Sequence, residues 1–400
     1  MIGTLRQGLC PLPRAHFEAT IWVPRRPSDD CTGAADVWSQ SLRRGCHSMR
    51  IALVAPNYFP PESGNAVTVR RIERSLATLG CEVQVFPTDY LAPEALLRSL
   101  QRFGPQLLHA FHGYSGGRVA HALSAETGIP YLITLTGSDI YQALEDQRSL
   151  EIHSLLRGAK RLVAFHGSIK QRLAVHMPTL QEHTVVIAQG VAVPPLTAEP
   201  SPADEFIFLL PAGVRPVKNL LFPLEPLQEV YEKHPEVRLR IVGPIRDTAY
   251  AAEVMDALEA HPFARYLGAV RHDQMAELYR KCHVVLNTSL FEGGMANSVL
   301  EALAHGRAVL ASDVEGNRSI VKEGVTGLLF RDAEEFVLKA ERIMSDHHLR
   351  GRLAKNGRAE VEEKYSPEAE GRGYLQLYRE IVAECGEGAG TAAYGDAHHL

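Results

Sequence analysis

An acidic residue, two glycines and a second acidic residue lie close together in the stretch TSLFEGGMANSVLEA, residues 288–302. A helix beginning behind Gly293 and Gly294 would give their backbone N–H groups a site for a diphosphate. Glu292 could accept hydrogen bonds from sugar hydroxyls, and Glu301, within the helix, could bind a ribose diol. An ordinary turn into a helix, with one solvated glutamate, fits the same residues, so this stretch alone leaves both interpretations open.

Two basic residues occupy a second loop, AGVRPVKN, directly after the apolar run FIFLLP. The guanidinium of Arg215 and the ammonium of Lys218 would neutralise charge that develops on a departing diphosphate. Exposed cations are usually just solvated, and the two residues by themselves favour that alternative. Arg215 and Lys218 therefore count as site residues only if they lie close to the loop at 288–302 in the folded protein.

Two loops of the N-terminal half carry further candidates. In PPESGNAVTV, Gly64 and Asn65 can adopt unusual backbone angles and bring amides close to a ligand, although a plain turn explains them equally well. In TLTGSDI, Thr136 and Asp139 leave an apolar run together. Asp139 could orient a sugar or cap the next helix, and capping is the more frequent use of such a residue.

A metal site is not expected. His109 and His112 flank a predicted strand end and could face a cleft, but they have no His-x-x-x-His spacing and no carboxylate beside them. The six cysteines contain no CxxC pair, which favours a reducing compartment, and we expect a cytoplasmic protein.

Charge and hydropathy exclude two classes of partner. The formal net charge is −5, without a long run of either sign, so neither nucleic acid nor an anionic membrane is expected as the main partner. The longest apolar runs are the size of strands, far below the roughly 20 residues of a membrane-spanning helix. We therefore expect no transmembrane anchor.

Apolar β-type runs alternate with amphipathic segments from Arg50 onward, which is typical of βαβ units and parallel sheets. Apolar residues recur at helical spacing, namely Val69, Ile72, Leu76 and Leu79, and Gly80 offers a left-handed helix end. The Pro-rich stretch VPPLTAEPSPADE interrupts this alternation, which indicates a linker between two Rossmann-like halves. Strand exits of such halves face a ligand, so the four loops are expected at one cleft.

Six parts follow from this pattern. They are an N-terminal extension at 1–48, a first domain at 49–190, a linker at 191–205, a second domain at 206–365, a helix at 366–384 and a flexible tail at 385–400. The extension has no apolar period and is expected to be disordered or spurious. An organellar presequence is disfavoured by its acids, such as Glu18, Asp29 and Asp30.

Taken together, these motifs resemble those of retaining glycosyltransferases of the GT-B fold, from Met49 to about Val382. SGNAVTVRR, TGSD, AFHGSIK, GVRPVKN, IVGP and EGGMANSVLEA look closest to the subgroup of glycosyltransferase 1 domain-containing proteins. The resemblance implies an α/β chain of two doubly wound parallel-sheet domains facing across a cleft. The first domain would take the acceptor, the second would bind the nucleotide sugar, and the C-terminal helix would cross back to the first.

The resemblance also implies roles for single residues. Glu292 would contact the donor sugar, Glu301 the ribose, and Arg215 and Lys218 the diphosphate. The chain departs from the family pattern twice. One additional residue separates the two glutamates, and Thr136 stands where many relatives carry histidine.

The activity that this resemblance implies is transfer of a hexose from a nucleoside diphosphate sugar to an acceptor hydroxyl, with retention. A UDP-sugar is slightly favoured as donor, no metal or other cofactor is expected, and the acceptor and the oligomeric state are left open. A sugar-nucleotide epimerase on the same fold, or an eroded protein that only binds nucleotide sugars, remains an alternative. An NAD-dependent dehydrogenase is disfavoured, because no G-x-G-x-x-G follows RIALVAP.

Overall fold

The computed structural model describes residues 48–56, 58–59, 64–137, 139, 149–196, 205–292 and 294–392. The expected N-terminal extension, apart from Ser48, and the end of the expected tail lie outside these residues. Within this described part, none of the helices combines the length and the apolar composition that crossing a bilayer requires.

A parallel six-stranded sheet forms the first half, with the strand order β2-β1-β3-β4-β5-β6. The order reverses between β1 and β3, and ligands of such sheets bind beyond the strand ends at the point of reversal. The strands are β1 (Arg50–Ala55), β2 (Glu82–Pro87), β3 (Leu107–Phe111), β4 (Tyr131–Thr134), β5 (Leu162–Ala164) and β6 (Thr184–Val186). The helices between them are α2 (Gly64–Thr78), α3 (Pro93–Phe103), α4 (Gly117–Thr127), α6 (Ser149–Gly158) and α7 (Gly167–His176).

The second half repeats this plan with the strand order β12-β11-β10-β7-β8-β9, which reverses between β7 and β10. Its strands are β7 (Phe206–Pro211), β8 (Val237–Val242), β9 (Ala264–Tyr266), β10 (Val284–Asn287), β11 (Ala308–Ser312) and β12 (Leu328–Phe330). Its helices are α8 (Leu224–Lys233), α9 (Thr248–Glu259), α10 (His272–Lys281), α11 (Asn297–Ala304), α12 (Glu315–Arg318), α13 (Ala333–Ser345) and α14 (His347–Lys364). Strand β9 is not predicted by the sequence, because it has three residues and none of them is buried.

Each sheet is covered on both faces, as parallel sheets require. Ala52 and Val54 of β1 pack with α3, α4, α6 and α7, whereas the alternate residues Ile51 and Leu53 pack with α2. In the second sheet, Phe208 belongs to the core under α8, α9 and α13. The neighbouring residue of the same strand, Leu209, packs with α11 on the other face.

The helical pattern expected after the first strand is confirmed. Val69, Ile72 and Leu76 of α2 are fully buried, and Gly80 has a φ of 87°, the left-handed conformation that ends helices. The apolar stripe thus fixes which side of α2 faces the sheet. The first residues of α2 lie near the carboxyl end of β1.

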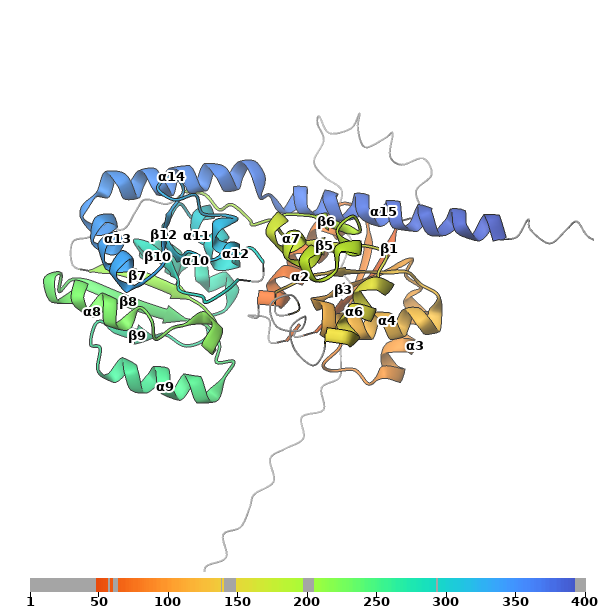
Figure 1. Cartoon of the computed structure of the whole chain (residues 1–400), viewed down its shortest axis with the longest axis horizontal. Coiled ribbons are helices and arrows are strands. Elements are labelled where there is room, and N and C mark those ends of the chain that lie inside the picture. Colours follow the sequence, from red (N-terminus) through yellow and green to blue (C-terminus); the bar gives the residue numbers. More distant parts are fainter. Residues whose placement is uncertain are drawn as a thin grey trace, which may run out of the picture. The chain divides into compact units, whose positions relative to one another are not determined.

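The last helix, α15 (Pro367–Ala392), returns to the first sheet and packs beside α2 (Figure 1). Tyr374 and Tyr378 lie fully buried in the core that α2 shares with β1. Arg71 of α2 donates two hydrogen bonds to Glu370, from Nε to Oε2 at 2.6 Å and from Nη2 to Oε1 at 3.0 Å. This ion pair is almost completely buried and joins α15 to α2.

Helix α15 continues to Ala392 and so extends into the segment expected as a tail, 385–400. Once a helix is anchored by packing, each further residue adds one hydrogen bond without a new nucleation step. The glycines of this stretch therefore weaken the helix without ending it.

Two segments that connect the halves lie side by side. The N–H of Val191 donates to the carbonyl oxygen of Tyr365 at 2.7 Å. A Cβ atom on Gly190 would lie 2.6 Å from Cα of Pro367, so glycine is required for this close approach. The first residues of the predicted linker thus run beside the junction of α14 and α15, whereas 197–204 lie outside the described residues.

Candidate active site

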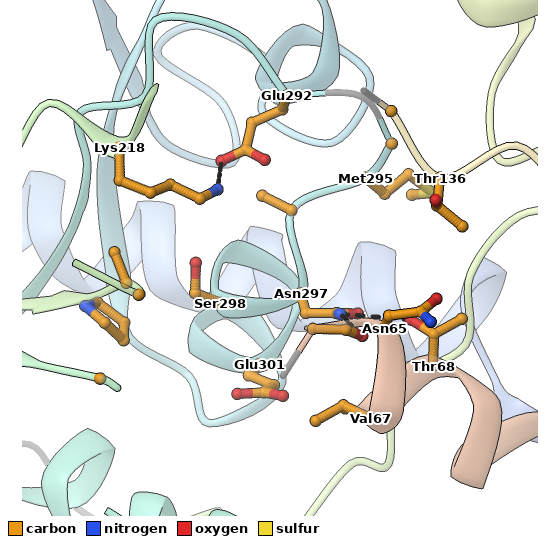
Figure 2. A pocket seen from close by; sticks show the side chains of 18 of the residues that line it. Asn65, Val67, Thr68, Thr136, Lys218, Glu292, Met295, Asn297, Ser298 and Glu301 are labelled. Carbon is orange, nitrogen blue, oxygen red and sulfur yellow. Dashed lines mark hydrogen bonds and ion pairs between the residues drawn. The ribbon is translucent and has the colours of Figure 1, made fainter. Parts of the chain in front are cut away.

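A pocket of about 560 Å³ is lined by residues at the carboxyl ends of strands from both sheets. Figure 2 shows the pocket from close by, with side chains of both halves around it. Most of the residues predicted from the sequence line it: Arg215, Lys218, Glu292, Gly294, Glu301, Gly64, Asn65 and Thr136. Asp139 is not among the lining residues, and Gly293 lies outside the described residues.

Backbone contacts fix the exit of β7. Residues Pro216–Lys218 form a short 3-10 turn after Arg215. The N–H of Leu290, in the loop after β10, donates to the carbonyl oxygen of Val217 at 2.9 Å. The two strand exits at the reversal of the second sheet are therefore hydrogen-bonded to each other.

Glu292 is held by three hydrogen bonds to one oxygen. Its Oε1 accepts from Nζ of Lys218 at 2.6 Å, from Oγ of Ser289 at 2.6 Å and from Nδ2 of Asn287 at 3.0 Å. Burial raises the pKa of Glu292, but the charge and hydrogen bond of Lys218 and the bonds from Ser289 and Asn287 outweigh burial and hold it below its usual value. The carboxylate is therefore ionised at neutral pH, and Figure 2 shows it facing Lys218.

Two glycines allow this loop to pack closely. A Cβ atom on Gly294 would lie 2.9 Å from the ring of Phe165, which belongs to the first half. A Cβ atom on Gly316 of α12 would lie 2.4 Å from Cβ of Glu292. Close packing is thus one reason for glycine at position 294, in addition to the anion binding expected from the sequence.

Glu301 lies one helical turn into α11, which begins at Asn297. Its Oε2 accepts a hydrogen bond of 2.9 Å from Oη of Tyr279. Burial, together with the charge of Glu301, raises the pKa of Tyr279 well above its usual value, so this hydroxyl stays protonated and remains a donor. Tyr279 also lines the pocket and is not predicted by the sequence.

Asn297, the first residue of α11, contacts the first half directly. Its Oδ1 accepts from Nε2 of Gln189 at 3.0 Å. Its Nδ2 donates to Oγ1 of Thr68 at 3.5 Å (Figure 2). The same Nδ2 also donates to the carbonyl oxygen of Gly64 at 3.4 Å. The helix behind the Gly-Gly loop is therefore joined to the start of α2, a contact that no local pattern indicates.

The expectation of unusual backbone angles in the loop after β1 is wrong for its two named residues. Gly64 and Asn65 form the first turn of α2, and neither has a positive φ. Nδ2 of Asn65 donates to the carbonyl oxygen of Pro56, whereas its Oδ1 is buried without a hydrogen-bond partner among the described residues. Helix formation overrides the local freedom of glycine here.

Asp139 organises backbone instead of lining the pocket. The side chain is fully buried. Its Oδ2 accepts from the N–H groups of Gly113 at 2.7 Å and Thr136 at 3.0 Å, and its Oδ1 accepts from that of Gly137 at 2.6 Å. These bonds connect the exits of β3 and β4 and set the position of Thr136 at the pocket wall.

The two histidines near the end of β3 have separate environments. Nδ1 of His109 lies 2.7 Å from Oη of Tyr378, and its Nε2 lies 2.7 Å from Oγ1 of Thr134. Burial lowers the pKa of His109 to about 3, so it is a neutral residue beneath α15. His112 lines the pocket and has a φ of 71°, a left-handed conformation that non-glycine residues seldom adopt.

Arg246, which follows β8, also lines the pocket and is not among the residues that the sequence predicts. A signal for it exists, because it is a basic residue in a strand-exit loop, as Arg215 is. No group of three or more His, Cys, Asp or Glu residues in the described part is arranged to hold a metal ion.

Comparison with solved structures identifies the architecture. HepE of Anabaena, crystallised with UDP and glucose, aligns with a TM-score of 0.71 over 83% of this chain and 100% of its own, at 18% identity. Sucrose-phosphate synthase from Thermosynechococcus elongatus aligns with a TM-score of 0.70 over 84% of this chain and 100% of its own, at 20% identity. The chain therefore has the GT-B fold of glycosyltransferases, as the sequence predicts.

Sequence comparison agrees with this class. Residues 205–346 match the family described as glycosyl transferases group 1. Glycosyltransferase 1 domain-containing protein 1 of Xenopus tropicalis is 27% identical over 79% of this chain and 94% of that protein. A D-inositol 3-phosphate glycosyltransferase of Streptomyces bingchenggensis is 23% identical over 86% of this chain and 92% of its own length. These sequence matches are to glycosyltransferases, and the matched family segment lies on the second sheet.

Proposed function

We propose that this chain is a retaining glycosyltransferase that moves a hexose from a nucleoside diphosphate sugar to an acceptor hydroxyl. One observation carries the proposal. Four residues from the exits of β7 and β10 and from α11 line one pocket: Arg215, Lys218, Glu292 and Glu301. Each of them alone has a plain structural explanation, but a shared pocket gives all four a common ligand. Crystal structures of HepE contain UDP and UDP-glucose, so a UDP-sugar is our first choice of donor.

The donor is held by groups of opposite charge. Lys218 and Arg215 would stabilise the negative charge on the departing diphosphate, where preorganised cations contribute most. Glu292, kept ionised by Lys218, offers acceptor oxygens to the hydroxyls of the hexose. Glu301, oriented by Tyr279, would accept hydrogen bonds from the ribose diol.

Retention follows if the acceptor attacks from the side on which the diphosphate leaves. The bond between the anomeric carbon and the phosphate oxygen breaks, and a new bond to the acceptor oxygen forms. The proton of the acceptor passes to the leaving phosphate, so no protein base is needed. Gly64, Asn65 and Thr136 would position the acceptor, because they form the opposite wall of the pocket.

In this proposal the reaction uses no metal and no cofactor, and it takes place in the cytoplasm. Cys81, Cys282 and Cys385 are free thiols, and the first two are buried, which suits a reducing compartment.

A ligand screen tests the proposal. We expect UDP, tested beside GDP, ADP and NAD, to raise the melting temperature, since a ligand at a hundred times its dissociation constant stabilises by about 2.7 kcal/mol. UDP-glucose should then release UDP, and NMR of a transferred product should show the anomeric configuration of the donor.

Other outcomes would replace the proposal. Stabilisation by NAD alone would indicate a dehydrogenase, and conversion of UDP-glucose to an epimer without release of UDP would indicate an epimerase. Binding of UDP without any turnover of donor would indicate an eroded binding protein. A product of opposite configuration would remove retention while keeping the transferase.

A further inference from the structure

Two arginines of the second half lie at the ends of adjacent strands. Strand β7 pairs with β8, and Arg215 and Arg246 follow these two strands and line the same pocket. Neither guanidinium makes a hydrogen bond or an ion pair with any residue that the structure describes. Neither charge is therefore compensated by a direct contact, although Glu292 acts on Arg215 through space.

Backbone hydrogen bonds hold the two loops together. The N–H of Val214 donates to the carbonyl oxygen of Pro244 at 2.9 Å, and the N–H of Arg246 donates back to that of Val214 at 3.0 Å. Val214 immediately precedes Arg215, so the two arginines start from neighbouring backbone positions. The fold therefore fixes the backbones of the two arginines close to each other.

Glycine leaves the space that the second arginine occupies. A Cβ atom on Gly213 would lie 3.3 Å from Cγ of Arg246, so the stem of this side chain crosses the β7 exit directly over bare backbone. Gly243, at the end of β8, has a φ of 150°, and a Cβ atom there would lie 2.1 Å from the carbonyl oxygen of Ala212. Gly213 and Gly243, which both line the pocket, therefore present only main chain at these two positions.

The electrostatics of the three basic residues differ. Burial lowers the pKa of Arg215, the charge of Arg246 lowers it further, and only Glu292 opposes them. Lys218, in contrast, is paired with Glu292 at 2.6 Å, so its charge is largely compensated. Two like charges held close together repel each other, and an anion that binds between them offsets this repulsion.

We propose that Arg246 is a binding residue for the diphosphate of the donor and that it acts together with Arg215. Two guanidinium forks can each bind phosphate oxygens in a bidentate manner, whereas an ammonium acts as a single point of charge. Lys218 can still donate to the phosphate nearest the sugar, but its main contribution is to hold Glu292. This inference rests on the proposed function, since it specifies how the same pocket recognises a nucleoside diphosphate.

Calorimetric titration separates this contribution from folding and from base recognition. The probes are UDP, inorganic pyrophosphate and uridine, and GDP or ADP replaces UDP if the wild type prefers it. We expect Arg246→Ala to weaken binding of the nucleoside diphosphate and of pyrophosphate by about ten- to a hundredfold, the loss typical of one charge-assisted contact. Uridine should bind equally well to both proteins.

Arg265→Ala is the matched control, because Arg265 is an exposed arginine of β9 in the same sheet and does not line the pocket. It should bind all probes like the wild type, and Arg246→Lys should recover part of the lost affinity. Equal affinity of Arg246→Ala and wild type for the diphosphate would overturn the inference and leave the proposed function standing. A wild type that binds none of the nucleoside diphosphates would overturn both.

Discussion

Nζ of Lys218 lies 2.6 Å from Oε1 of Glu292 and so joins the exits of β7 and β10. The side chains are only 17% and 10% exposed, so water screens their attraction weakly. A residue proposed to bind the sugar and one proposed to bind the diphosphate are therefore a single electrostatic unit. Removing Lys218 would take away the charge and the hydrogen bond that lower the pKa of Glu292.

Lys218→Ala should reduce the free energy of unfolding by about 3 kcal/mol near neutral pH, because it leaves a largely buried carboxylate unpaired. The ordinary pKa of a glutamate is 4.5, and in the folded protein the pKa of Glu292 is lower than this value. The stabilisation is therefore present above that value and is lost as the pH falls through the lower folded pKa. Urea unfolding of both proteins at several pH values should show a difference that shrinks in acid. A difference independent of pH would contradict the assignment.

Glu292→Gln should separate turnover from nucleotide binding. Glutamine keeps the shape of the side chain but removes the charge and replaces one acceptor oxygen with an NH₂ donor. Turnover of the nucleotide sugar should fall by about tenfold or more, whereas affinity for the bare nucleoside diphosphate should stay nearly unchanged. Steady-state kinetics and calorimetry on the same preparations provide the comparison with Lys218→Ala, which should lose affinity. An equal loss of affinity in both variants would refute the separate roles.

Gly316→Ala should disturb the site without touching a ligand. Its new Cβ would lie 2.4 Å from Cβ of Glu292 and 2.6 Å from the carbonyl oxygen of Gly294, so the loop must shift. We expect a marked loss of turnover and a lower melting temperature, since overpacking typically costs about 1–3 kcal/mol. Gly351→Ala is the control, because a Cβ there meets nothing within 4 Å and alanine favours a helix. Similar effects of both substitutions would show that the contact with Glu292 is unimportant.

Glu370→Gln should destabilise the contact of α15 with α2. The substitution leaves the guanidinium of Arg71 buried without its counter-charge, which typically costs about 3–5 kcal/mol. Glu368→Gln, on the same helix but exposed, should change stability by no more than about 0.5 kcal/mol. Chemical denaturation of both variants measures the difference. A loss below about 1 kcal/mol for Glu370→Gln would show that the pair contributes little to the net stability.

His109 should make the protein sensitive to acid. Its folded pKa is about 3 and its ordinary value is 6.5, so between these values the unfolded chain binds a proton that the folded chain does not. Stability should therefore fall with decreasing pH across this range, by up to about 1.4 kcal/mol per pH unit from this residue. His109→Gln, which does not titrate, should flatten this part of the stability profile. An unchanged slope would show that other groups cause the acid sensitivity.

The sequence by itself determined the two wound sheets, because strand and helix periods are local and each element follows from its own apolar pattern. Arg215, Lys218, Glu292 and Glu301 could be named for the same reason: polar residues at strand exits of a doubly wound sheet point to its ligand edge. The reversal of strand order between β7 and β10 places these exits side by side. The sequence therefore names the candidate residues, and the strand order of the folded sheet brings them together.

Only the tertiary structure decided how those residues are paired. Three contacts join segments that are far apart in the chain. They are the ion pair of Lys218 with Glu292, the hydrogen bonds of the buried Asp139 and the contact of Asn297 with α2. Arg246 lies beside Arg215 because backbone hydrogen bonds join their two loops. Hydrogen bonds and charge compensation depend on distances of a few ångströms between separate elements, and no periodicity within one element encodes such distances.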